Sequence, residues 1–262
     1  MSNIQTNLPP YYTRLGPFES AFLTGQPILM YHHVGHRPRG ARLKGLYVSE
    51  RLFRRQIREL KAAGFSTPPY DTVASCGPNA ARHVYLTFDD GFCDVVQNAA
   101  AVLHQIGFRA MMFLVADLLG GANQWQQREG DAPAPLASVA QVQEWLAAGN
   151  EIGSHTLTHP RLTSLPVERA REEIAASKKK LEDIFARPIQ HFCYPYGDWN
   201  ECVRDLVAEA GYTTACTTDF GVNDASAHPL ALRRITARYK SRSIKALKSW
   251  LVRRWNTFLG AV

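Results

Sequence analysis

The sequence lacks the features that mark several protein classes. None of its five cysteines forms a C-x-x-C pair and their number is odd, so a reducing compartment fits better than a disulfide framework. No apolar run approaches the roughly 18 residues that cross a bilayer. The N-terminus has no basic region followed by an apolar run, so no signal peptide is predicted. No zinc finger, basic stripe or RNA-binding motif indicates nucleic-acid binding. We expect a cytoplasmic protein.

The composition is that of a globular domain. The chain has 262 residues, of which 45% are hydrophobic and 20% are charged, which argues against disorder and allows a sizeable core. The formal net charge is +7. This charge either serves solubility or attracts an anionic partner such as phosphate, lipid headgroups or an acidic glycan.

Candidate strands and helices alternate along the chain. The apolar runs predict strands at 27–31, 84–88, 110–115, 191–193 and 212–216, and helical spacing predicts helices at 50–63, 94–106, 139–148, 166–185 and 199–210. Residues 1–27 resemble a loose leader, and residues 117–137 a surface insertion. The alternation indicates an α/β fold with parallel strands. We favour a barrel over an open sheet, because no Gly-rich phosphate loop follows the first strand.

Two adjacent carboxylates follow the strand at 84–88. Asp89 and Asp90 repel each other unless a cation or a basic group lies nearby. Neighbouring side chains in an extended chain point in opposite directions, but the turn that begins at Gly91 can bring both into one pocket. The alternative is a turn in which an Asp caps the next helix.

Two histidines form a second candidate. His155 and His159 are four residues apart, so they share a face if the segment is helical. Two imidazoles and a carboxylate from elsewhere can bind one metal ion, and catalytic zinc sites keep three protein ligands and an open position for water. The alternative is two unrelated histidines on the surface or in the core.

An aromatic segment at 192–197 is the third candidate. Pro195 makes its turn rigid and Gly197 permits close approach of the backbone. Together with Trp199, the rings of this segment, including Tyr194, can form a wall on which a sugar stacks. The alternative is an aromatic turn packed on the core.

In this order and at strand ends, the three segments resemble the polysaccharide deacetylase family of metal-dependent carbohydrate esterases, which act on N-acetylated sugars. T-F-D-D-G at 87–91 and H-T-L-T-H at 155–159 match its first two motifs fully, and 195–197 matches the P-Y-G core of the third. The residues at 30–32, M-Y-H, resemble a subgroup with Y-P-Y-G that acts on exopolysaccharide or lipid-linked glycans. The resemblance covers roughly residues 28–236. It implies a distorted (β/α) barrel of about seven parallel strands with surrounding helices, which we place at 28–240.

The resemblance also implies roles for individual residues. Asp90, His155 and His159 would hold a divalent metal, with zinc as the first expectation and cobalt, nickel or iron suited to the same ligands. Asp89 would be the general base, and the backbone N–H of Tyr196 would help to bind the oxyanion.

The sequence departs from the family pattern at two positions. Many members carry an Arg before P-Y-G that braces the catalytic Asp, but Cys193 stands at that position. Many members end with an L-x-H motif whose His is the acid, but Arg234 falls where that His would be, and an Arg does not release its proton near neutral pH. We hypothesise that Arg234 braces Asp89 in place of the missing Arg.

The general acid must then come from elsewhere. His32, at the end of the first strand, is the first candidate, and His33 and His228 are weaker ones. The alternative is that His32 only shapes the pocket. Asp219 lies in a loose match to a further family motif, and we favour a loop-capping role over one beside Arg234.

The C-terminal segment 241–262 is predicted to be a basic amphipathic helix. One apolar stripe runs along it (Ile244, Leu247, Leu251, Trp255 and Phe258), with basic residues beside or opposite the stripe (Lys245, Lys248, Arg253 and Arg254). The helix either docks on the barrel or, through residues 242–259, lies against an anionic membrane. The second arrangement would make the protein peripheral at the inner face of the membrane.

The sequence thus predicts a metal-dependent hydrolase that removes the N-acetyl group of an amino sugar in a glycan or a lipid-linked saccharide. A second interpretation keeps the metal site but assigns it another non-peptide amide. A third is a glycan-binding protein with a decayed site, which the altered motifs at Cys193 and Arg234 favour and the four motif residues that match fully oppose.

Overall fold

Seven parallel strands close into a barrel. The computed structural model describes residues 8–39, 41–74, 79, 81–125 and 133–239. The strands of the barrel, in their order around it, are β1 (Ile28–Tyr31), β4 (Tyr85–Phe88), β5 (Met111–Leu114), β6 (Glu151–Ser154), β7 (His191–Cys193), β8 (Thr214–Phe220) and β9 (Leu232–Thr236). β9 pairs with β1 to complete the circle. The predicted α/β barrel is confirmed.

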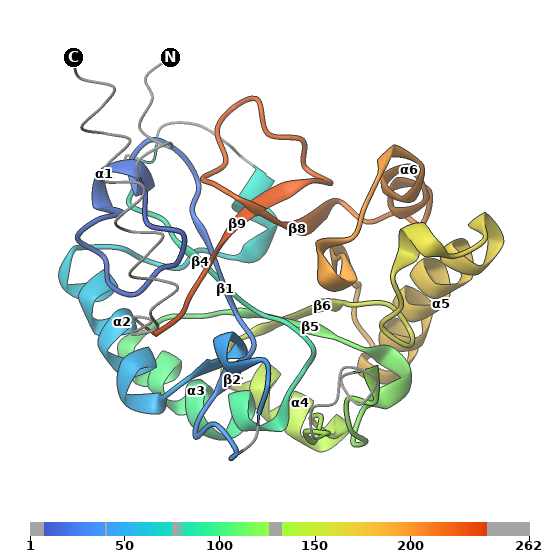
Figure 1. Cartoon of the computed structure of the whole chain (residues 1–262), viewed down its shortest axis with the longest axis horizontal. Helices are drawn as coiled ribbons and strands as arrows, with labels where there is room; N and C mark the ends of the chain where they lie inside the picture. Colours follow the sequence, from blue (N-terminus) through green and yellow to red (C-terminus); the bar gives the residue numbers. More distant parts are fainter. Residues whose placement is uncertain (1–7, 40, 75–78, 80, 126–132, 240–262) are drawn as a thin grey trace.

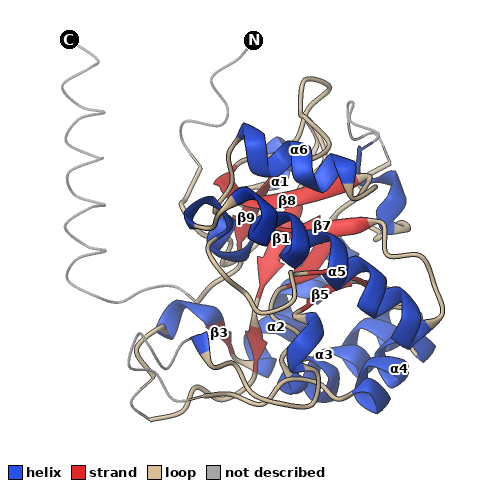
Figure 2. Cartoon of the chain, turned by 90° about the vertical axis from the view of Figure 1, so that its right-hand side faces the viewer, coloured by secondary structure: helices blue, strands red, loops and turns tan. Residues whose placement is uncertain are grey.

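Helices surround the strands (Figures 1 and 2). They are α1 (Glu19–Phe22), α2 (Glu50–Ala62), α3 (Cys93–Ile106), α4 (Val139–Ala147), α5 (Val167–Phe185) and α6 (Glu201–Glu209). The long ones lie within a few residues of their predicted bounds, because local signals define their ends. The side chain of Ser49 accepts a hydrogen bond from the amide of Leu52 and caps α2, and Gly107 ends α3 with a φ of 75°.

Apolar side chains form two separate clusters. The larger one lies between the strands and the helices and contains residues such as Phe88 and Trp145. The smaller one contains side chains from alternate strand positions, among them Met111, Phe113 and Leu232. Because successive side chains of a strand point to opposite faces, the smaller cluster fills the inside of the barrel below the strand ends.

The expected loose leader is wrong for residues 8–27. Tyr12, Phe18 and Phe22 are buried, their rings lie within 6 Å of one another, and the amide of Tyr12 donates to the carbonyl of Thr236. Tyr12 also forms a parallel bridge with Ala237 just after β9, so this segment packs beside the end of that strand. Burial of these aromatic rings outweighs the Gly and Pro content on which the expectation rested.

The predicted insertion at 117–137 is described only in part. Its end is not a surface loop, because Leu136 and Ala137 are buried and the amide of Ala137 donates to the carbonyl of Gly91. Outside the barrel, β2 (His33–Val34) and β3 (Tyr47–Val48) form a two-stranded sheet, and the loop between them follows β1 in the chain. The helix predicted at 241–262 lies outside the described residues. Among those described, no helix is long and apolar enough to span a bilayer.

Candidate active site

The carboxyl ends of the strands meet at one pocket of about 450 Å³. His32 follows β1, Asp89 and Asp90 follow β4, and His155 follows β6. All four side chains line the pocket. Because the strands are parallel, their carboxyl ends lie on the same side of the barrel, where enzymes of this architecture hold their active sites.

Arg234 lies inside the barrel and holds the carboxylate of Asp89 at both oxygens. Its Nη1 and Nη2 donate to Oδ1 and Oδ2 of Asp89, each at 2.7 Å. Arg234 is 1% exposed and Asp89 3%. Burial alone would raise the pKa of Asp89, but the charge and hydrogen bonds of Arg234 bring it below its ordinary value. Asp89 is therefore ionised at neutral pH and fixed in orientation, as the bracing hypothesis requires.

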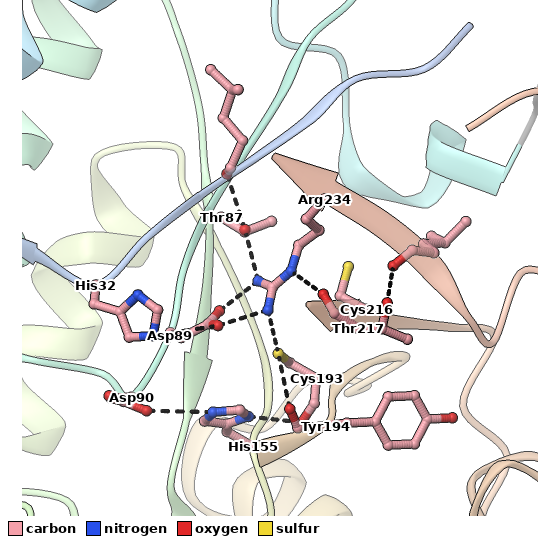
Figure 3. Close-up of polar contacts among 12 residues, drawn as sticks. His32, Thr87, Asp89, Asp90, His155, Cys193, Tyr194, Cys216, Thr217 and Arg234 are labelled. Atoms are coloured by element: carbon pink, nitrogen blue, oxygen red, sulfur yellow. Dashed lines mark hydrogen bonds and ion pairs between the residues drawn. The ribbon is translucent and has the colours of Figure 1, made fainter. Parts of the chain in front are cut away.

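The remaining donors of Arg234 are also satisfied (Figure 3). Nε donates to the carbonyl of Thr217 at 2.8 Å, and Nη1 donates to Oγ1 of Thr87 at 3.0 Å. Nη2 also lies 3.1 Å from Sγ of Cys193. Cys193 thus stands where many family members have an Arg, and its small side chain leaves the space that the guanidinium from β9 fills.

Asp90, His155 and His159 form a buried set of possible metal ligands. Nε2 of His155 and Nε2 of His159 lie 3.4 Å and 3.3 Å from Oδ1 of Asp90. One ligand atom from each residue lies within 4.8 Å of the others. Ligand atoms about 2.0–2.1 Å from a tetrahedral zinc are about 3.3 Å apart, so the observed spacing fits a shared metal ion.

The surroundings of the two imidazoles are compatible with metal binding. Nδ1 of His155 lies 2.7 Å from the carbonyl oxygen of Cys193, and a proton held there leaves Nε2 free to bind the metal. Burial lowers the pKa of His159, which keeps that ring neutral. The ring of His159 packs between neighbours, 4.2 Å from the ring of Trp125 and 4.6 Å from that of Tyr196.

A second possible ligand set shares His155 and adds Asp89 and Cys193. Asp89 is already bound at both oxygens by Arg234, and burial raises the pKa of the Cys193 thiol well above its ordinary value. A neutral thiol is a poor ligand. The set that contains Asp90 is therefore the better metal site.

The two histidines come together without a helix. The chain after β6 is a loop in which Thr156 and His159 have φ values of 71° and 66°. The carboxylate of Glu173 on α5 holds this loop, since it accepts hydrogen bonds from the amides of Leu157 and Thr158 and from the Thr158 hydroxyl. The segment is not helical, so the helix that would have placed both histidines on one face is absent. A strained turn brings the two side chains together instead.

The P-Y-G turn supplies part of the pocket wall. Tyr194 and Tyr196 line the pocket, and Tyr196 has a φ of 60°. A Cβ on Gly197 would lie 2.0 Å from Oγ1 of Thr218, so only glycine fits here. Pro195 and Trp199, which we predicted to bind substrate, are not among the lining residues. The ring of Trp199 instead packs 6.2 Å from that of Tyr194.

The three candidate acids differ in position. Nε2 of His32 lies 3.9 Å from Oδ2 of Asp89 and the side chain faces the pocket. His33 points elsewhere, stacked on Tyr47 and Phe92 with Nδ1 2.9 Å from Asp94. His228 accepts a hydrogen bond from the amide of Leu230 and does not line the pocket.

Among the described residues, no hydrogen bond or ion pair joins the carboxylate of Asp219 to Arg234. Asp219 lies near the end of β8, exposed, and its carboxylate accepts a hydrogen bond from Nε1 of Trp199 at 3.2 Å. The structure therefore gives it a local role, although in a strand rather than in the loop that we expected.

Several pocket residues were not predicted. Leu43, Leu46, Trp125, Arg161 and Arg238 all line the pocket. Most lie on loops, where no periodic pattern marks a residue. Trp125, the one tryptophan in a polar, Gly-rich segment, was the only such residue with an unusual side chain for its surroundings, and it packs on the ring of His159.

Comparisons with known proteins find a family that matches the central part of this chain. A family model described as polysaccharide deacetylase matches residues 77–215. That range contains Asp89, Asp90, His155 and His159 but neither His32 nor Arg234.

Three individual proteins illustrate the similarity. The Bacillus subtilis protein YxkH is 27% identical over 213 residues, 80% of this chain and 70% of YxkH. A chitooligosaccharide deacetylase of Bradyrhizobium is 28% identical over 137 residues, 51% of this chain and 54% of that enzyme. The structure of the Streptococcus pyogenes deacetylase PplD in complex with acetate matches with a TM-score of 0.70 at 25% identity, over 82% of this chain and 92% of PplD.

Proposed function

The chain belongs to the polysaccharide deacetylase family, and on that premise we propose that it hydrolyses the acetamide of an N-acetylated amino sugar, with Asp89 as general base beside a metal ion bound by Asp90, His155 and His159. The products are acetate and a free amino sugar. The relatives support this reaction, since they include a chitooligosaccharide deacetylase and a deacetylase solved with acetate.

One observation carries the proposal above all. An ionised carboxylate, Asp89, and a set of three possible metal ligands are adjacent, buried and open to the same pocket. Two carboxylates so close together in the interior are costly unless each is compensated. Arg234 compensates Asp89, and a divalent cation would compensate Asp90, whose pKa burial would raise but the two histidines bring well below its ordinary value.

A metal ion held there would polarise the acetyl carbonyl and lower the pKa of a water molecule. Two nitrogen ligands and one carboxylate suit zinc first, and cobalt, nickel or iron as well. Asp89 accepts the proton of the attacking water, because its carboxylate is ionised and held in place by Arg234. The backbone N–H of Tyr196 is our candidate for binding the oxyanion of the tetrahedral species.

The departing amine requires a proton, and we assign its delivery to His32. Burial lowers the pKa of this imidazole despite the nearby carboxylates, so the ring is neutral in the free enzyme. It can therefore donate only after it has gained a proton during the reaction. Asp89 holds a proton after water attacks and lies 3.9 Å from Nε2 of His32, which makes it the nearest source.

The variant His32→Asn is expected to lower kcat by about 10²- to 10⁴-fold, the usual contribution of a general acid. The metal content should stay at the wild-type value, because His32 is outside the ligand set. His228→Asn is the matched control and should retain wild-type turnover. Undiminished turnover in His32→Asn would end its candidacy and leave it a role in shaping the pocket.

Release of acetate together with free amine tests the reaction itself. A panel of N-acetylated chito-oligomers, lipid-linked N-acetylhexosamine and nucleotide sugars should yield equal amounts of both products from at least one substrate. A protein that binds one metal ion tightly but releases neither product from any of them would favour another amide substrate or a binding function.

We further propose, from the sequence alone, that residues 242–259 bring the enzyme to an anionic membrane from the cytoplasmic side. The apolar stripe and basic residues of that segment support this proposal. In a flotation experiment with anionic liposomes, the full chain should float and a chain ending at residue 240 should not. Equal flotation of the two proteins would contradict the proposal.

A further inference from the structure

Two guanidinium groups face the pocket in addition to the one inside the barrel. Arg161 follows the loop that carries His159, and Arg238 follows β9; both side chains line the pocket that contains Asp89. Neither has a carboxylate within ion-pair distance in the part of the chain that the structure describes. A positive charge at a pocket without a carboxylate to pair with it requires an explanation.

Arg238 is held against its neighbours and does not extend into solvent. Its Cζ lies 4.5 Å from the centroid of the Tyr11 ring and 5.6 Å from that of the Tyr239 ring. A Cβ on Gly45 would lie 2.8 Å from the same atom, so the backbone of the loop at Gly45 lies directly against the guanidinium. Its own amide donates to the carbonyl of Tyr12 at 2.8 Å. The group is thus in place before any ligand binds.

One donor of this guanidinium is buried and unsatisfied. Nε of Arg238 has no hydrogen-bond partner among the described residues, and an unpaired buried donor is unfavourable, more so when it is charged. Such a group in a native structure calls for an explanation, and an ion or ligand that accepts its hydrogen bond is one. The ligand that a guanidinium matches best is a phosphate or a carboxylate, whose oxygens can accept two parallel hydrogen bonds.

Arg161 has a similar chemical character but is less constrained. Its Cζ lies 4.1 Å from the centroid of the Tyr196 ring, and its side chain is exposed. Stacking on Tyr196 orients the guanidinium plane beside the ring that forms the pocket wall. It is therefore placed to assist with an anionic ligand that already contacts Arg238.

The loop that forms one wall of the pocket adds to the positive field. The segment 35–48 contains no acidic residue and four basic ones, all exposed (Arg37, Arg39, Arg42 and Lys44). Leu43 and Leu46 of the same loop line the pocket. An apolar wall with a cationic outer side attracts a ligand that combines a sugar ring with negative charge.

We propose that the substrate is an anionic amino sugar, in which a phosphate or a carboxylate lies next to the N-acetylated ring and is bound by Arg238 with assistance from Arg161. This inference rests on the proposed deacetylase function and names its substrate class. The negative group comes either from a phosphate that links the sugar to a lipid or from a neighbouring uronic acid.

Three substrates separate these cases. They are a neutral chito-oligomer, a prenyl-diphosphate-linked N-acetylhexosamine, and an oligosaccharide in which N-acetylhexosamine alternates with a hexuronic acid. Wild-type protein loaded with zinc should show a higher kcat/KM on one of the two anionic substrates than on the neutral one. The better of the two anionic substrates identifies the source of the charge.

The variant Arg238→Gln should lower this preference, measured as the ratio of kcat/KM values, by about 10- to 100-fold, which is the effect of losing hydrogen bonds to a charged group. The loss should appear mainly in KM, because binding of a remote group is uniform along the reaction. Gly45→Ala, which keeps Arg238 but displaces its guanidinium, should act in the same direction. Arg187→Gln, at an exposed site outside the pocket, is the matched control.

Equal kcat/KM on neutral and anionic substrates would overturn the inference and leave the deacetylase function standing. A preference that survives Arg238→Gln and the double variant with Arg161→Gln would also overturn it. Failure to release acetate from all three substrates would instead overturn the proposed function and the inference with it.

Discussion

Asp89→Asn is expected to lower kcat by about 10²- to 10⁴-fold, because the amide cannot accept a proton from water. The substitution keeps the shape of the side chain, and Asp89 is not in the preferred ligand set. One metal ion per chain should therefore still bind, as measured by elemental analysis. Asp205→Asn, at an exposed carboxylate on α6, is the control and should retain full turnover.

The metal measurement separates two explanations for a loss of activity. If Asp89 is the base, Asp89→Asn is inactive with its metal in place, whereas His159→Ala is inactive because the metal is lost. An Asp89→Asn protein that has lost its metal would favour the second ligand set, in which Asp89 itself binds the ion.

Arg234→Met is expected to have the second large effect, on stability as well as on activity. It leaves the carboxylate of Asp89 buried without its partner, and breaking a buried pair in this way costs about 3–5 kcal/mol in the free energy of unfolding. Without the guanidinium, burial loses its largest opposing influence on Asp89, so the pKa of Asp89 rises. The acid limb of the pH profile of kcat/KM should therefore move to higher pH.

The shift of the acid limb distinguishes positioning of the base from a purely structural role, which would leave the profile in place. Arg234→Lys, whose single ammonium cannot match both oxygens, should give an intermediate shift. Cys193→Ser, which replaces the sulfur that contacts Nη2 but keeps both hydrogen bonds from Arg234 to Asp89, is the matched control. An unchanged profile in a folded Arg234→Met protein would contradict the bracing hypothesis.

The barrel architecture could be predicted from the sequence because local signals agree with the tertiary packing. The strands at 84–88 and 110–115 are short apolar runs, and the helices between strands have clear caps such as Ser49 and Gly107. β9 was not predicted as a strand, since a run with two arginines lacks the apolar pattern. In the fold it pairs with both β1 and β8, and Arg234 is buried there with its partner Asp89, a fact that no local pattern contains.

Site residues could be predicted where a short motif carries the chemistry, as at Asp89 and Asp90. The backbone conformations that bring these residues together could not be predicted. The φ values of Thr156 and His159 are set by the loop contacts with Glu173 on α5 and not by the four-residue spacing. Arg238 and Trp125 reach the pocket through the fold alone, and so no spacing rule could have placed them there.

Metal-dependent release of acetate is the most direct test of the account. Protein freed of metal by a chelator is titrated with zinc, and acetate from an N-acetylated substrate accepted by the enzyme is measured at each step. We predict that release rises with added zinc, levels off near one ion per chain, and is absent throughout in His159→Ala. Undiminished release from the metal-free protein, or none from protein that has bound one ion, would contradict the central claim.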